Sequence, residues 1–191
     1  MLSGVVEGDE TYIGGKAEFM HKEERKRKIP GRGTAGKQIV QGFVERGGEV
    51  RAKHIYDTTP QTFHDHNREN VEPGTILFTD QHDSYRGLGK DYYHDFVNHK
   101  NKEYVREDVH TNTIENFWSL FKRGLKGTYI SVEPFHLNRY VSEQEFRFNH
   151  RLGNDQDRFL AATIRMKDGY LSYKGLVQHL KKPRRGGPKK S

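Results

Sequence analysis

Residues 110–126 read HTNTIENFWSLFKRGLK, and hydrophobic residues recur in this stretch at the spacing of an α-helix. At about 100° per residue, one stripe of that helix holds Ile114, Phe117, Trp118, Phe121 and Leu125. The pattern therefore predicts a helix that packs on a core. Glu115 and Lys122 lie two turns apart along one flank of the stripe, and a carboxylate beside a buried face needs an explanation.

Two explanations of Glu115 are open from the residues alone. Asn112 precedes Glu115 by three positions, so the two could form a capping box at the start of the helix. The other explanation is a shared site, because Asp9 lies in a predicted first strand and Asp80 ends a predicted apolar strand. Acids on three separate elements could converge at one edge of a sheet.

The first half of the chain reads as a series of strands. VVEGDETYIGG, from Val5, predicts a strand that enters a turn, and residues 38–57 predict two strands around the hairpin signal Gly47-Gly48. A short helix with Pro60 in its first turn and the strand GTILFTD, residues 74–80, are expected next.

The second half is predicted to be mainly helical. Residues 82–92 favour a weak helix and YHDFV, residues 93–97, a short strand before the helix described above. Residues 131–150 predict a further helix with Pro134 near its start, and residues 159–166 can be helical. The expected order up to the first long helix is β-β-β-α-β-α-β-α, an α/β fold.

Composition favours a nucleic-acid partner. The 191 residues suit one domain with a modest core, since 32% are hydrophobic and 31% are charged. The 33 Lys and Arg exceed the 26 Asp and Glu, which gives a net charge of +7 and suits a polyanionic partner. Disulfides and Cys-based zinc sites are excluded within the chain, which has no cysteine. Without an apolar run of about 20 residues or a signal core, we expect a soluble, cytoplasmic protein.

The gathered acids suggest a metal site. Carboxylates brought together repel one another unless cations hold them, and hard oxygen ligands suit Mg²⁺ or Mn²⁺. Two such ions about 4 Å apart can activate an attacking oxygen and stabilise the leaving oxygen of a phosphodiester. We therefore expect phosphoryl transfer on nucleic acid.

Other acids and histidines compete for these roles. Glu7 is the serious rival of Asp9, whereas strand alternation puts Glu10 on the opposite side. Asp83 competes with Asp80 but can instead cap the next segment. Asn116 falls on the wrong face of the helix. The spacing of three histidines matches no standard zinc pattern, so exposed or DNA-facing roles are favoured for His82, His99 and His110.

Four motifs together carry a family resemblance: GDETYIGGK, LFTDQHDSY, VHTNTIENFWSLFKRGLKGTY and HLNRYVSEQEFRFNHR. They closely resemble the catalytic domain of bacterial DDE-type insertion-sequence transposases of the Xanthomonas-element group, from about residue 5 to residue 152. The resemblance implies a ribonuclease H-like fold, with a mixed sheet of about five strands flanked by helices. It also implies a DDE metal site of Asp9, Asp80 and Glu115 that holds two Mg²⁺ or Mn²⁺ ions. Glu115 follows Asp80 by 35 positions, a spacing typical of the superfamily.

The same resemblance implies an accessory lysine at Lys122 and double-stranded DNA, at transposon ends and target, as the partner. Lys16, Lys122, Arg123 and Lys126 are the expected phosphate contacts, and a homo-oligomer is expected on DNA. The implied activity is strand cleavage and strand transfer. The alternatives are an inactive DNA-binding relic and a ribonuclease H-like nuclease that cuts without joining.

The domain boundaries expected from the sequence are a catalytic domain over 1–152, with a basic loop at 16–37, then a helical extension over 153–180. Residues 181–191 form a basic tail with nothing to bury, which we expect to be disordered. Transposases of this kind usually carry an N-terminal DNA-recognition region, and the first motif begins close to Met1. We therefore expect an N-terminally truncated copy, an alternative start, or a domain that relies on end recognition from elsewhere.

Overall fold

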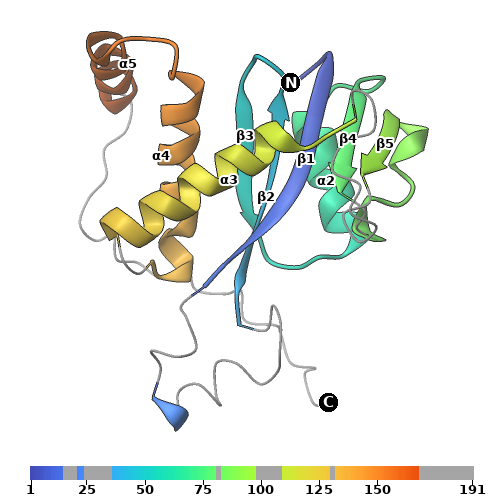
Figure 1. The fold of residues 1–191 in the computed structure, drawn as a ribbon, viewed down its shortest axis with the longest axis horizontal. Helices are drawn as coiled ribbons and strands as arrows, with labels where there is room; N and C mark the ends of the chain where they lie inside the picture. The colour runs from blue at the N-terminus through green and yellow to red at the C-terminus, as the bar shows by residue number, and fades with distance from the viewer. Residues whose placement is uncertain (15–20, 24–35, 81–82, 98–108, 130–131, 168–191) are drawn as a thin grey trace, which may run out of the picture. The chain divides into compact units, whose positions relative to one another are not determined.

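The structure of the chain is a computed structural model that describes residues 1–14, 21–23, 36–80, 83–97, 109–129 and 132–167. The chain divides into two compact units, Met1–Arg151 and Leu152–Ser191. The first unit holds the sheet and its covering helices (Figure 1). In the second unit, the described element is the helix α5, Asp155–Lys167.

A single mixed sheet organises the first unit. Its strands are β1 (Val5–Ile13), β2 (Gln38–Glu45), β3 (Val50–Ile55), β4 (Ile76–Asp80) and β5 (Tyr93–Val97). The strand order is β3-β2-β1-β4-β5, in which β1, β2 and β3 pair antiparallel while β4 runs parallel to β1 and to β5. The predicted mixed sheet of about five strands flanked by helices is confirmed.

Tight turns and capping fix the ends of several elements. The β2–β3 hairpin turns at Gly47, whose φ of 76° lies in the region that glycine adopts without a steric penalty. The helix α2, Pro60–Asn70, begins after Thr59, whose side chain accepts from the Thr62 N–H. Pro60 occupies the first turn, as the sequence predicts.

One face of the sheet is covered by α3 (Asn112–Gly124) and α4 (Leu137–Asn149), which follows the 3₁₀ turn Pro134–His136 (Figure 1). The stripe predicted from helical spacing is buried here, since all five of its residues belong to the core. They pack with side chains from β2, β3 and α4: Val40, Val44, Val50, Leu137, Val141 and Phe148. The asparagines at the two ends of α4 accept from the backbone N–H groups of Val50 and His54 on β3, an edge strand. Those bonds satisfy backbone N–H groups of the edge strand that could otherwise pair with another chain.

The opposite face packs against α2 and the segment after β4. Its core holds Leu2, Val6, Phe43, Ile55, Phe63, Val71, Leu77, Tyr85, Leu88 and Tyr92. Val6 faces this core while the next residue, Glu7, contacts α3, as strand alternation requires. The two faces of β1 therefore serve two separate cores.

Two local expectations were wrong. The segment 82–92 contains 3₁₀ turns at Asp83–Tyr85 and Leu88–Lys90 instead of a helix, and Gly87 between them has a φ of 92° that a continuous helix cannot accommodate. The N-cap of α3 is Thr111, not Asn112, so Glu115 is the fourth helical residue and not the third. The predicted capping box with Asn112 therefore does not fit the observed helix start.

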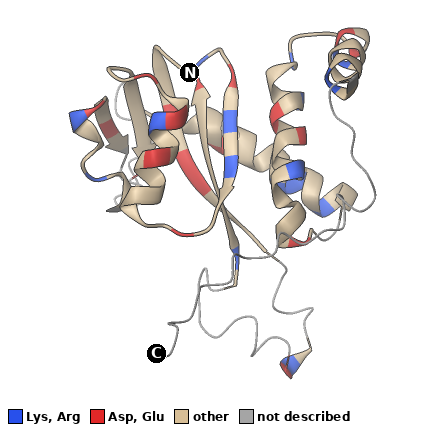
Figure 2. Cartoon of the chain, turned by 180° about the vertical axis from the view of Figure 1, so that it is seen from behind, with Lys and Arg blue, Asp and Glu red and all other residues tan. Residues whose placement is uncertain are grey.

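Acidic and basic residues are both distributed over the described helices and strands, with acids on β1 and bases on β3 (Figure 2). The basic excess of the sequence falls mainly in ranges outside the described residues, including most of 16–37 and all of 181–191. Within the described part of the chain, the helices are too short or too polar to cross a membrane.

Candidate active site

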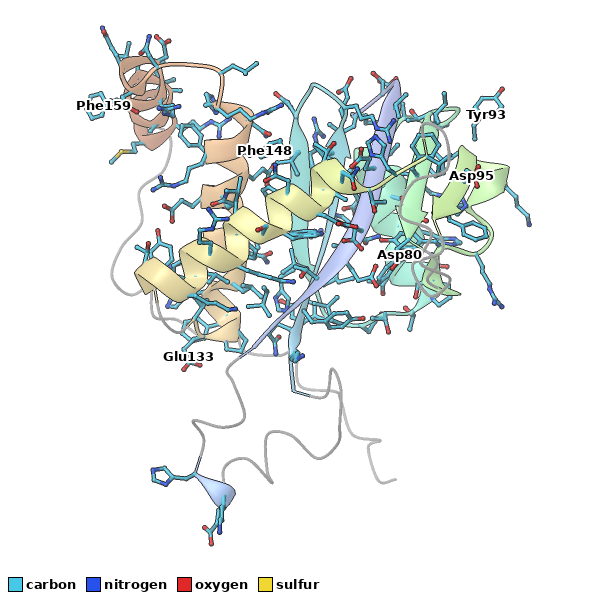
Figure 3. All side chains as sticks on the ribbon, in the orientation of Figure 1. Asp80, Tyr93, Asp95, Glu133, Phe148 and Phe159 are labelled. Carbon is cyan, nitrogen blue, oxygen red and sulfur yellow. The ribbon has the colours of Figure 1, made fainter. Side chains whose placement is uncertain are left out.

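Asp9 and Asp80 lie at the same level on neighbouring parallel strands. Gly8 on β1 is in register with Thr79 on β4, and Asp9 and Asp80 are the next residues along. Adjacent strands are about 4.8 Å apart, and in-register residues of parallel strands point to the same face. Asp80 ends β4 beside β1 and is partly buried (Figure 3). The topology thus brings together two acids that are 71 positions apart in the sequence.

The Asp9 side chain points towards α3. Its Oδ2 accepts a hydrogen bond of 3.0 Å from Nε1 of Trp118, which lies on the buried stripe of that helix. Glu115 is exposed, three residues before Trp118, and its Oε1 accepts a hydrogen bond of 3.1 Å from the Thr111 hydroxyl. Glu115 therefore lies on the helix that contacts Asp9.

Burial and neighbouring acids both affect the ionisation of Asp9. The pKa of Asp9 lies well above its usual value, first because of burial and then because of the neighbouring Glu10. A hydrogen bond from the Glu10 backbone acts in the opposite direction, while the charges of Asp80 and Glu115 raise the pKa of Asp9 further. Asp9, Asp80 and Glu115 thus belong to one region of unfavourable negative charge.

Glu7, the rival of Asp9, has a different environment. It is fully buried, and its carboxylate accepts from the backbone N–H groups of Thr113 and Ile114, at 2.8 and 3.1 Å, and from the Thr113 hydroxyl at 3.0 Å. The guanidinium of Arg46 donates to the same carboxylate at 2.8 Å. Glu7 therefore caps the amino end of α3 and neutralises a largely buried arginine, which leaves Asp9 as the strand acid with freer coordination.

The chemistry of the donors at this edge suits a hard divalent cation. Three carboxylates would supply oxygen ligands. Burial is the main reason for the raised pKa of Asp9, and a bound cation would relieve the further increase that comes from the neighbouring acids. The carboxylates do not form a closed cage, however, because no group of three or more His, Asp or Glu side chains within the described ranges is close enough to hold a metal ion. Asp9, Asp80 and Glu115 would have to draw closer around an ion.

Basic side chains gather in the last turn of α3 and in the segment that follows it. Lys122, Arg123 and Lys126 are exposed and line a depression of about 520 Å³ with Ser119 and Gly127. The pKa of the Lys122 ammonium lies below its usual value, mainly because nearby protein displaces water, while the charge of Asp9 acts in the opposite direction. The charges of Lys126 and Lys37 lower it further. Lys122 therefore links this depression to the charge of Asp9.

The remaining predicted residues have varied outcomes. Lys16, His82 and His99 lie outside the described residues. His110 is partly buried, with Nδ1 3.3 Å from Oε1 of Glu7 but without the alignment of a hydrogen bond, so it belongs to the Glu7 cluster. Asn116 is exposed on α3, as the helical spacing predicts.

Known proteins resemble this chain over most of its length. Residues 1–149 match the family of ISXO2-like transposase domains. The chain belongs to this family. An uncharacterized transposase-like protein of Haemophilus influenzae is 33% identical over 84 residues, which is 44% of this chain and 67% of that protein. A crystal structure of the catalytic core domain of BIV integrase aligns with a TM-score of 0.49 and 13% identity, covering 87% of this chain and 99% of the integrase chain.

The family resemblance inferred from the four motifs is thus confirmed, and a transposase-type function follows for this transposase domain. The sequence does not predict the hydrogen bond from Trp118 to Asp9 or the capping of α3 by Glu7. The helical spacing predicts Trp118 only as a core residue, although a buried indole N–H usually finds a hydrogen-bond partner. The sequence pattern presents Glu7 only as a possible metal ligand, although an acid on a buried strand face must be paired.

Proposed function

We propose that this transposase domain catalyses metal-dependent cleavage of DNA strands at insertion-sequence ends and transfer of those strands to target DNA. The observation that supports it most is the in-register position of Asp9 and Asp80, with Glu115 on the helix that contacts Asp9. Those three acids are the residues that would hold two Mg²⁺ or Mn²⁺ ions. Such ions, when bound, activate an attacking oxygen and stabilise the leaving oxygen of a phosphodiester.

Basic residues of the protein would bind the DNA and orient it beside the three acids. Lys122 would contact a phosphate next to the reacting one, because the charge of its ammonium interacts with the charge of Asp9. Arg123 and Lys126 would hold the flanking backbone from the same depression, and Lys16 would add a contact from the basic loop. These are charge contacts to phosphate, which position DNA without reading its sequence. A homo-oligomer on DNA would bring two ends together.

The test uses the whole chain and duplex DNA that carries the inverted repeats flanking its gene. Strand cleavage and strand joining are measured with Mg²⁺, with Mn²⁺ and with EDTA. Metal-dependent cleavage followed by joining supports the proposal. Cleavage without joining would instead identify a ribonuclease H-like nuclease, and DNA binding without either step would identify an inactive relic.

A further inference from the structure

The indole of Trp118 lies against the strand that carries Asp9. Trp118 is 4% exposed, and its Nε1 donates to Oδ2 of Asp9 across 109 positions of sequence. An indole N–H is only a donor and does not titrate, so it favours one orientation of the carboxylate. It is also the sole tryptophan of the chain.

Gly42 leaves room for the indole to reach Asp9. Gly42 pairs with Asp9 on one side and with Ala52 on the other, so these three residues form one row across β1, β2 and β3. A Cβ atom at Gly42 would lie 2.8 Å from Cη2 and 2.9 Å from Cζ2 of Trp118. Contacts that short do not occur, so any side chain at Gly42 would displace the indole. The bare backbone there therefore sets how deeply Trp118 lies.

The hydrogen bond acts on an acid that has other acids nearby. Glu10, Asp80 and Glu115 all carry charges that disfavour the ionised Asp9. Like charges disfavour the ionised carboxylate, whereas a hydrogen-bond donor such as the indole N–H favours it. Trp118 supplies that donor from within the core, where packing against Phe117 and Phe121 restrains the ring.

We propose that Trp118 is a positioning residue: its N–H holds the Asp9 carboxylate in the orientation needed for metal binding beside Asp80, and Gly42 sets the depth of the indole. This inference rests on the proposed function, because it assumes that Asp9 is a ligand. Outer hydrogen bonds to metal-binding carboxylates typically contribute about 10- to 100-fold to metal affinity or activity.

The test replaces Trp118 by a tryptophan analogue in which sulfur stands in place of the indole N–H. With one tryptophan in the chain, this substitution alters one atom group at one site and keeps the ring volume. Mn²⁺ affinity is measured directly from the electron paramagnetic resonance signal of free Mn²⁺, together with thermal unfolding. We expect the Mn²⁺ dissociation constant to rise about tenfold with little change in melting temperature.

Two variants complete the design. Gly42→Ala keeps the N–H but displaces the ring, so it should weaken Mn²⁺ binding in the same direction. Val71→Ala removes apolar volume from the core on the opposite face of the sheet, which does not contain Trp118, so it should lower stability and leave Mn²⁺ affinity near wild type.

The outcomes separate this inference from the function on which it rests. If wild type binds Mn²⁺ and Asp80→Asn does not, the metal site stands, and an analogue protein that binds as tightly as wild type would overturn the role of Trp118. If wild type and Asp80→Asn bind equally weakly, the proposed metal site is wrong and the inference fails with it.

Discussion

The carboxylate of Glu7 accepts a 2.8 Å hydrogen bond from the backbone N–H of Thr113, 106 positions later in the chain. That bond joins the first strand to the first turn of α3. Arg46, which follows β2, donates to the same carboxylate and also to the carbonyl of His110 at 3.0 Å. The helix that carries Glu115 is thus attached to the sheet at its amino end.

Glu7→Gln should destabilise the fold. The amide removes the charge that compensates the N–H groups of Thr113 and Ile114, and it leaves the guanidinium of Arg46 without its buried partner. Breaking a buried ion pair costs about 3–5 kcal/mol. Urea unfolding followed by circular dichroism measures the loss.

Glu69→Gln is the matched control for Glu7→Gln. Its ion pair with Lys53 is 3.4 Å long and exposed on both sides, so its removal should cost less than about 1 kcal/mol. If the two variants lost the same small amount of stability, Glu7 would not be the main anchor of α3.

The stability of the fold should fall in mild acid because of His66. The ring is buried on α2, and its Nδ1 lies 3.0 Å from Oε1 of Gln41. Burial, together with the charge of Lys53 and against that of Glu69, lowers the pKa of His66 to about 4. The unfolded chain binds this proton near pH 6.5, so the stability contributed by neutral His66 is complete above about pH 6.5 and is lost as pH falls towards 4.

The expected loss from His66 is roughly 3 kcal/mol between pH 7 and pH 4. His66→Leu removes the titrating ring, so its free energy of unfolding should depend less on pH in this window than that of wild type. Urea unfolding at several pH values gives the two curves. Parallel curves would mean that His66 titrates alike in the folded and unfolded chains.

DNA affinity should depend on Lys122. If Lys122 contacts one phosphate, Lys122→Met should make the plot of log affinity against log salt concentration less steep by about one unit. Lys90→Met, on the 3₁₀ turn Leu88–Lys90, removes the same charge elsewhere and should leave the slope unchanged. Fluorescence anisotropy with labelled duplex DNA gives both slopes. An equal change in the two variants would argue against a specific phosphate contact at Lys122.

The elements most accurately predicted from sequence are those whose local pattern suffices. The stripe from Ile114 to Leu125 is buried as the helical spacing requires, and β4 ends at Asp80 as the run of apolar residues indicates. Strand alternation predicts that Glu10 and Asp9 point to opposite faces of the sheet. This is confirmed, because Glu10 accepts from the Tyr85 hydroxyl on the face opposite Asp9.

Local sequence patterns do not predict the contacts between residues that are far apart in the chain. The cap of α3 comes from Glu7, and no pattern within residues 110–126 contains that donor–acceptor pairing. The need for glycine at position 42 likewise depends on Trp118, which reaches it only after the helix has packed on β2. The helix predicted for residues 82–92 was wrong for a local reason, because Gly87 has a positive φ.

We propose that Asp9, Asp80 and Glu115 form the catalytic metal site. Glu115→Gln tests it most cleanly, because the amide oxygen can still accept from the Thr111 hydroxyl while the negative charge is lost. Glu133→Gln is the control, since Glu133 is exposed and lies far from Asp80 (Figure 3).

The deciding measurement is Mg²⁺-dependent strand cleavage by wild type and both variants, alongside thermal unfolding. We predict that Glu115→Gln melts near wild type, or slightly above it because carboxylate repulsion is relieved, yet cleaves at least about 100-fold more slowly. Glu133→Gln should cleave like wild type. Cleavage by Glu115→Gln at the wild-type rate would show that Glu115 is not a ligand of the catalytic metal.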